Sequence, residues 1–285
     1  MSKKSIGMIC IIAGLVSAVL GIKAKNNEPA NLEIIRNAVY VSDGKVLPEN
    51  EGKVVIVTGI LDAELPFVDE ETGILLNTIV TYRHVEKLRI QENAEGGADY
   101  WEWDEVMDKA SYGGTGKIIA PGVTLGEFAV SDEFIKTIPA AWNRTEYDKK
   151  ELNQLGWNTF EDVRKVYLCQ DERMPLEDED ITHYEEIGRE EAYLDYVGTI
   201  RVTYDETDAD NTMEYTIIGL QENGRLLEVE ELDLKAICSG HLTVEELLAY
   251  AEESASSAAT GSMVMALAFA VIGVLVLIRS GRKKS

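Results

Sequence analysis

Cysteine and histidine are scarce in this chain, with three residues of each type. The histidines stand far apart, and none has a cysteine or acidic partner at the spacing of metal ligands: His84, His183 and His241. Cys10 lies in an apolar run, so only Cys169 and Cys238 could form a disulfide, and we expect buried thiols there instead. These shortages give no sign of a metal centre, and we expect no metal and no cofactor.

Catalytic motifs are also missing. There is no G-x-S-x-G sequence, and GGTGK at 113–117 lacks the first glycine and the following serine or threonine of a phosphate-binding loop. Acidic clusters at 205–210 and 177–180 lack the glycine and terminal glutamate of a calcium-binding EF-hand loop, so we expect solvated loops there. No nucleophile with its base can be named, and we expect that the protein is not an enzyme.

Basic residues are outnumbered, with 27 lysines and arginines against 51 acidic residues. Seven of the basic residues lie outside 24–258, where there is no acid: Lys3, Lys4, Lys23, Arg279, Arg282, Lys283 and Lys284. The stretch 24–258 therefore holds 20 basic and 51 acidic residues, a formal charge of −31. Such a surface repels phosphates, which argues against nucleic acid as a partner.

Two long uncharged runs stand near the ends of the chain. The first, IGMICIIAGLVSAVLGI at 6–22, would reach roughly 25 Å as a helix, slightly short of a hydrocarbon core of about 30 Å. The second, SMVMALAFAVIGVLVLI at 262–278, is followed by four basic residues. Basic residues outside both runs predict two transmembrane helices with both termini in the cytosol.

These runs divide the chain into five predicted parts. They are a cytosolic N-terminus at 1–5, a transmembrane helix at 6–22, an acidic extracytoplasmic or lumenal domain at 23–258, a transmembrane helix at 262–278 and a basic cytosolic tail at 279–285. A cleaved signal peptide is the alternative for the first run. Small residues fall near one face of each predicted helix: Gly14, Ala18 and Gly21 in the first, and Ala266, Ala270 and Gly273 in the second. Such spacing lets helices approach closely, but we attribute these residues to the ordinary composition of membrane spans.

The acidic domain is predicted to be rich in β-strands, which with its helices gives an α+β fold class. We expect a buried strand at 53–61, a hairpin formed by 78–91 and 100–106, and a second hairpin formed by 198–205 and 213–219. A helix at 242–253 should begin with a capping box of Thr243 and Glu246 and lead into the second membrane span. Another helix is expected at 181–196.

Several of these segments resemble the LUMA (transmembrane protein 43) family. They are PENEGKVVIVTGIL from Pro48, TYRHVEKLRIQE at 81–92, YWEW at 100–103, LGEFAVSDEFI at 125–135, VGTIRVTY at 197–204 and GHLTVEELLAYAEESAS from Gly240. The positions that carry the family motifs are Glu51, Gly52, Gly59, Arg83, His84, Val85, Glu86, Trp103, Gly198, Arg201, Glu245 and Glu246. Arg83 and Glu86 lie three apart in a strand, so they should point to opposite faces and have different partners.

The resemblance implies a retained first anchor, self-association and a non-enzymatic role in organising membrane protein complexes. Animal members carry several spans after the domain, whereas this chain has room for one, so it looks like the short prokaryotic form. The membrane would be the plasma membrane in a prokaryote and the endoplasmic reticulum or nuclear envelope in a eukaryote. We expect a scaffold with the lipid bilayer, its own copies or other membrane proteins as partners; an extracytoplasmic sensor or binding module for a small ligand or cation is the alternative.

Overall fold

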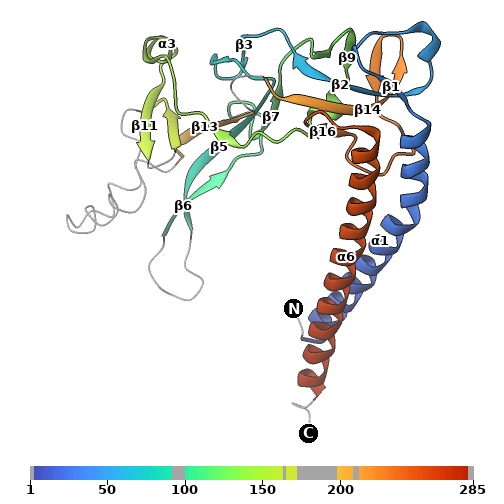
Figure 1. Ribbon diagram of the computed structural model, residues 1–285. Coiled ribbons are helices and arrows are strands. Elements are labelled where there is room, and N and C mark those ends of the chain that lie inside the picture. Colours follow the sequence, from blue (N-terminus) through green and yellow to red (C-terminus); the bar gives the residue numbers. More distant parts are fainter. Residues whose placement is uncertain (1–2, 92–99, 163–164, 172–197, 208–211, 282–285) are drawn as a thin grey trace. The chain divides into compact units, whose positions relative to one another are not determined.

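The computed structural model describes residues 3–91, 100–162, 165–171, 198–207 and 212–281, and they form two compact units (Figure 1). The first unit combines both ends of the chain, up to Gly59 and from Glu214 onward. The second unit, Ile60–Met213, is inserted between them. Helices at the two ends and strands between them confirm the predicted α+β class.

The first unit contains two long helices, α1 (Lys3–Asn37) and α6 (Val244–Gly281). Its strands are β1 (Val39–Val41), β2 (Val54–Asp62), β14 (Glu214–Glu222), β15 (Arg225–Leu227) and β16 (Ile237–Ser239), and a short 3-10 helix covers Pro48–Asn50. β14 pairs with β2, β15 and β16, whereas β1 runs parallel to β2. Strand β2 confirms the strand expected at 53–61.

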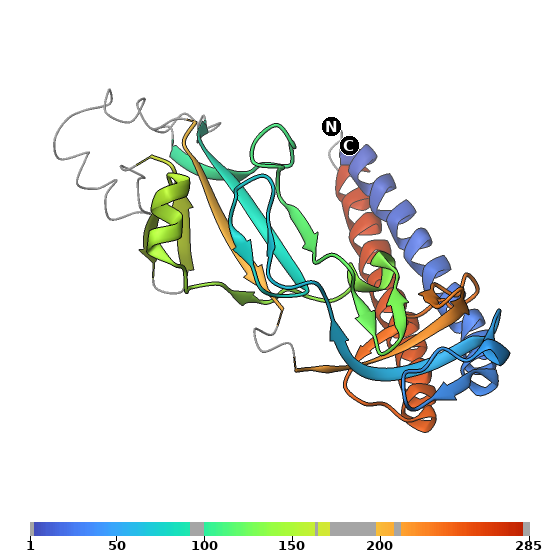
Figure 2. The ribbon, with the colours of Figure 1, turned by 90° about the horizontal axis from the view of Figure 1, so that it is seen from above.

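The two helices lie side by side and run in opposite directions (Figures 1 and 2). At the sheet end, Leu32 and Ile35 of α1 share a buried core with Leu247 of α6 and with Ile56 and Ile218 of the strands. Helix α6 is continuous from its capping box to its last turn, so the predicted helix at 242–253 and the second apolar run form one element. The core thereby fixes both helices to the sheet.

The capping box at the start of α6 is present as predicted. The backbone N–H of Thr243 donates to Glu246 Oε2 at 2.8 Å, and the backbone N–H of Glu246 donates to Thr243 Oγ1 at 3.2 Å. Hydrogen bonds from Thr243 lower the pKa of the Glu246 carboxyl, first through its backbone N–H and then through its hydroxyl. The helix therefore begins where the sequence places it.

The second unit is built on a sheet with the strand order β11-β12-β13-β5-β6. These strands are β11 (Asn158–Asp162), β12 (Lys165–Cys169), β13 (Ile200–Glu206), β5 (Val80–Gln91) and β6 (Tyr100–Glu105), with β7 (Gly116–Ile119) and β10 (Trp142–Asn143) paired at the sides. β5 and β6 pair antiparallel from Glu86↔Glu105 to Gln91↔Tyr100, which confirms the first predicted hairpin.

Shorter elements complete this unit. They are β3 (Phe67–Val68), β4 (Leu75–Leu76), β8 (Thr124–Leu125), β9 (Phe128–Val130), α2 (Asp132–Ile135) and α3 (Lys149–Leu155). One face of the sheet carries the main core, in which Val85, Val202 and Leu168 from three adjacent strands pack with Trp157 and Tyr204. The opposite face carries Tyr167 and Cys169, with Trp103 and Phe160 against them.

The second predicted hairpin is wrong. Both strands exist, as β13 and β14, but β13 pairs with β5, β12 and β10, whereas β14 pairs with strands of the first unit. Two β-rich runs separated by a short polar loop resemble a hairpin locally, and the sequence pattern does not contain the long-range pairings that compete with it. The helix expected at 181–196 lies outside the described residues.

Candidate functional site

The contact between α1 and α6 is made by small residues. Gly7, Gly14 and Gly21 are buried and stand seven residues apart on α1. A Cβ added to Gly14 would lie 2.9 Å from the Ala266 carbonyl oxygen, and one added to Gly21 would lie 3.0 Å from Ser262 Cβ. The helices approach so closely that no larger side chain fits without a shift. Our attribution of these small residues to ordinary span composition was therefore wrong, because they form the helix contact.

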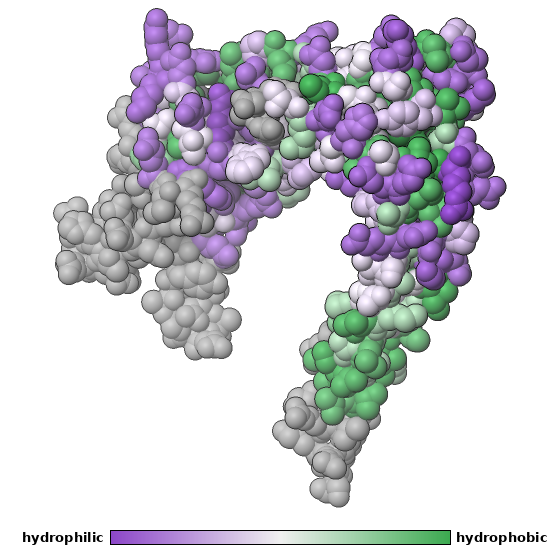
Figure 3. Space-filling model, in the orientation of Figure 1, coloured by the Kyte–Doolittle hydropathy of each residue, from purple (hydrophilic) through white to green (hydrophobic). Residues whose placement is uncertain are grey.

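Large apolar side chains point away from this contact, as Figure 3 shows for the end of the helix pair away from the sheet. The exposed ones include Ile6, Ile9, Ile12, Leu15, Val19 and Ile22 on α1 and Met263, Leu267, Val271 and Leu275 on α6. A water-soluble pair would bury these side chains and expose the small ones. The inverted pattern is that of helices solvated by lipid, and both helices are long and apolar enough to cross a membrane.

A charged cluster lies on one face of the second unit's sheet. Arg201 and Glu86 are directly opposite in β13 and β5, and Arg201 Nε donates to Glu86 Oε2 at 2.7 Å. The Arg201 guanidinium carbon stands 4.2 Å from the ring centroid of Trp103 and 4.0 Å from that of Tyr167. An arginine held by two aromatic faces and a carboxylate is fixed in position, and the Arg201 side chain is 4 % exposed.

Arg83 belongs to the opposite face and has a different carboxylate. Its Nη1 donates to both oxygens of Asp69, at 2.6 and 2.8 Å, and its Nε donates to the Gly114 carbonyl. The Tyr204 hydroxyl also donates to Asp69, at 2.8 Å. Burial, and next the Asp69 carboxylate, raise the pKa of Tyr204 well above its ordinary value. Tyr204 therefore stays a neutral donor, and Arg83 and Glu86 have separate partners, as the strand spacing predicts.

The glycine-rich GGTGK segment completes the Arg83 site. Gly113 has a φ of +69°, and a Cβ there would collide with the Arg83 guanidinium, so only glycine is compatible with this packing. The Thr115 hydroxyl accepts from the backbone N–H of Val85 and donates to the Val85 carbonyl. The segment therefore has a structural role beside β5.

His84 lies on the same face as Glu86. Its Nε2 is 2.9 Å from Asp205 Oδ2, and Asn143 Nδ2 donates to the other oxygen of Asp205 at 3.0 Å. The Tyr82 ring packs against the imidazole at a centroid distance of 4.6 Å. Asp205, expected in a solvated loop, instead belongs to this hydrogen-bonded group. His183, Asp208, Asp210 and the acidic run at 177–180 lie outside the described residues.

The other motif positions are spread over both units. Glu51 Oε1 accepts from the backbone N–H of Asn223, and the Gly52 N–H donates to the Gln221 carbonyl, which ties this turn to β14. Gly59 is the last residue of the first unit before the insertion. Gly198, with a φ of +96°, precedes β13 and donates to the Leu88 carbonyl. Glu245 lies exposed in the first turn of α6.

Of the twelve motif positions, the structure therefore brings Glu86, Trp103 and Arg201 into one cluster and places His84 on the same face. Sequence reasoning missed Asp69, Tyr204 and Tyr167, which complete the two arginine sites. The D-x-x-T-G sequence at 69–73 is typical of a turn and could have located Asp69 in one. It contains no signal for the distant Arg83.

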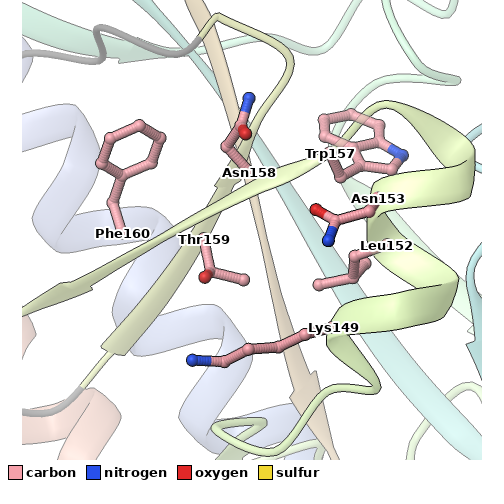
Figure 4. Close-up of a pocket in the computed structure, with 7 residues that line it drawn as sticks. All are labelled: Lys149, Leu152, Asn153, Trp157, Asn158, Thr159 and Phe160. Atoms are coloured by element: carbon pink, nitrogen blue, oxygen red, sulfur yellow. The ribbon is translucent and has the colours of Figure 1, made fainter.

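An open hollow beside α3 is one candidate place for a small ligand. It is lined by Lys149, Leu152, Asn153, Trp157, Asn158, Thr159 and Phe160, which come from α3 and from β11 with the residue before it (Figure 4). Leu152 and Trp157 belong to the core, and the Trp157 Nε1 already donates to the Thr72 carbonyl. Within the described residues, no three His, Cys, Asp or Glu side chains are grouped to hold a metal ion. Cys169 and Cys238 are buried free thiols, as expected.

Comparison with known proteins agrees with the membrane helices. The family model for Transmembrane protein 43 matches residues 113–281, more than half of the chain, from the glycine-rich segment to the end of α6. No curated protein and no solved structure matches the chain. The matched region includes β13 with Arg201 and the second membrane-spanning helix. The chain is therefore an integral membrane protein that belongs to the transmembrane protein 43 family.

Proposed function

We propose that this protein is a non-enzymatic membrane scaffold, which assembles with its own copies or with other membrane proteins through its non-cytosolic domain. The observation that carries the proposal is the continuity between anchor and domain. Leu32 and Ile35 of α1 and Leu247 and Ala251 of α6 belong to the same core as Ile56 of β2. A domain built onto two helices in this way has a restricted orientation, which suits a role in holding partners at a membrane.

The interior chemistry of the second unit also supports a structural role. Both buried arginines are saturated by neighbours, Arg83 by Asp69 and Arg201 by Glu86 with two aromatic rings. Burial raises the pKa of the Cys169 thiol, which disfavours the reactive thiolate. In the part of the chain that the structure describes, these groups stabilise the fold and are not presented to a substrate.

Self-association of the full-length protein tests the proposal. The chain should be extracted in a mild detergent, and its mass measured by light scattering over a range of concentrations. We expect defined species larger than one chain that dissociate in a denaturing detergent. A monomer at every concentration, in detergent and in lipid nanodiscs, would contradict self-assembly. A rise in melting temperature on calcium addition would favour the binding-module alternative.

A further inference from the structure

The helix contact fixes the depth at which each residue of one helix lies relative to the other. Gly14 and Gly21 of α1 lie against Ala266 and Ala259 of α6, so seven residues along one helix match seven residues back along the other. Gly7 continues the same register at the end nearest the termini, where it lies against both Gly273 and Leu277, one turn apart on α6. Because Cβ-free glycines are seated between side chains and carbonyls, neither helix can slide without losing these contacts.

Two lysines mark the sheet end of the apolar surface on α1. The side chains of Lys23 and Lys25 are 64 % and 60 % exposed. Lys23 Nζ lies 3.7 Å from Asp233, whose side chain is also bound by Asn27, one turn farther from the membrane run. The Lys23 ammonium therefore extends toward the sheet, as a lysine at a bilayer boundary does.

This boundary also applies to α6, which by sequence has more uncharged length available. The segment SASSAATG at 254–261 carries no charge and continues directly into the second apolar run. Gly21 lies against both Ala259 and Ser262, so counting two and four residues beyond it places Lys23 level with 257–260 of α6 and Lys25 level with 255–258. The serines and alanines at 254–257 therefore lie at or beyond the depth of the lysines, outside the hydrocarbon, whereas Ala259 lies beside Gly21 at the end of the first run.

At the other end, the apolar surface stops at matching depths. Lys3 and Lys4 precede Ile6 in the sequence, and Arg279 follows Ile278. Because Gly7 lies against both Gly273 and Leu277, the backbone of Lys3 comes level with 277–281 of α6, a range that includes Arg279. The apolar length shared by the two helices is then the 17 residues of the first run, or about 25 Å, against about 30 Å for a typical hydrocarbon core. Tilting shortens a span further, so this pair has no means of reaching across a thicker core.

We propose that the α1–α6 pair is matched to a thin bilayer, with a hydrocarbon core of about 25 Å, and selects such membranes over thicker ones. The surface that contacts the lipid consists of the exposed apolar side chains of α1 and α6 that lie between Lys23 and Lys25 at one end and the basic residues near the termini at the other. The partner is the lipid bilayer itself. In thicker bilayers the lipid must thin around the protein, or Lys23 and Lys25 must enter the hydrocarbon; both cost free energy. The proposal is independent of the scaffold function.

The test uses full-length protein in phosphatidylcholine bilayers whose acyl chains differ only in length: myristoleoyl, oleoyl and erucoyl. The midpoint of thermal unfolding is measured in each lipid. We expect the highest midpoint in the short or intermediate lipid and the lowest in the erucoyl lipid. A highest midpoint in erucoyl bilayers, or the same midpoint in all three, would overturn the proposal.

Two variants separate the lysine boundary from general lipid effects. In the double variant Lys23→Leu, Lys25→Leu, the uncharged segment of α6 can enter the bilayer, so the best lipid should become a longer one. Val16→Leu, a change on the lipid-facing surface, is the matched control and should keep the wild-type order of lipids. An unchanged order in the double variant would contradict the boundary at the lysines.

A second variant tests the match between apolar length and bilayer thickness if the lysine variant does not fold. Duplicating one heptad in each helix, 14–20 in α1 and 266–272 in α6, preserves the glycine and alanine contacts and adds about 10 Å of apolar length. The highest midpoint should then occur in the erucoyl bilayer. If the lengthened protein still unfolds at the highest temperature in the shortest lipid, apolar length does not set the preference.

Discussion

Arg201 and Glu86 form an ion pair across two neighbouring strands, in which the arginine is almost fully buried and Glu86 is 27 % exposed. Arg201→Met removes the guanidinium from between Trp103 and Tyr167 and leaves Glu86 without this partner. We expect the free energy of unfolding to fall by about 2–4 kcal/mol. This is less than for breaking a fully buried ion pair, because Glu86 is partly exposed to water. Chemical denaturation followed by tryptophan fluorescence measures it.

Arg89→Met, on the neighbouring strand β5, is the control for Arg201. Arg89 is 56 % exposed and lies 3.4 Å from Asp104, so its removal should cost less than about 1 kcal/mol. Equal effects of the two substitutions would mean that the aromatic enclosure of Arg201 contributes nothing.

Asp69 is the common acceptor of the Arg83 site, and Asp69→Ala should be the more damaging change in this unit. It leaves a buried guanidinium unpaired and removes the acceptor of the Tyr204 hydroxyl, at an expected cost of about 3–5 kcal/mol. Tyr204→Phe removes one hydrogen bond and should cost about 1–2 kcal/mol. Asp43→Ala, at an exposed ion pair with Lys45, should leave stability nearly unchanged. A mild effect of Asp69→Ala would show that the Arg83 site has another acceptor.

The strands, the capping box and the apolar helices could be predicted because each depends on residues close together in sequence. Val54–Asp62 is rich in β-branched residues and uncharged until its end, and Thr243 with Glu246 is a local pair. The partners of Arg83 and Arg201 could not be predicted, since Asp69 and Tyr167 come from separate segments that only the tertiary pairing brings together. The same limit explains the wrong hairpin, because the choice of β5 rather than β14 as a neighbour of β13 is a long-range one.

Gly14 should be intolerant of substitution, whereas its lipid-facing neighbours should not. Gly14→Leu places a side chain against Ala266 and Phe269, and overpacking of this kind costs about 1–3 kcal/mol. We expect a lower unfolding midpoint in oleoyl bilayers and separation of α1 from α6. Leu15→Ile, one residue along but 64 % exposed, is the matched change and should have little effect. If both variants unfold alike, the glycine contact does not hold the helices together.

Glu206 should make stability depend on pH. Burial raises the pKa of its carboxyl above the ordinary value of 4.5, against the opposing effect of Arg144, which lies 3.4 Å away. The folded state therefore binds the proton more tightly than the unfolded state, and this contribution to stability decreases as pH rises from about 4.5 through the raised folded value. Glu206→Gln should lack that decrease, so its stability relative to wild type should grow with pH across this window. A constant difference between the two proteins would contradict the shift.

The placement of both termini on one side of a membrane and of the domain between them on the other is tested most directly by protease protection. Full-length protein with a tag at each terminus is expressed in cells. Sealed inverted vesicles are prepared from their membranes, so that the cytosolic face is outside, and are treated with protease. We expect both tags to be removed while a fragment that contains 24–258 and both membrane helices survives until detergent is added. Loss of the domain without detergent, or protection of either tag, would contradict the two-helix anchor.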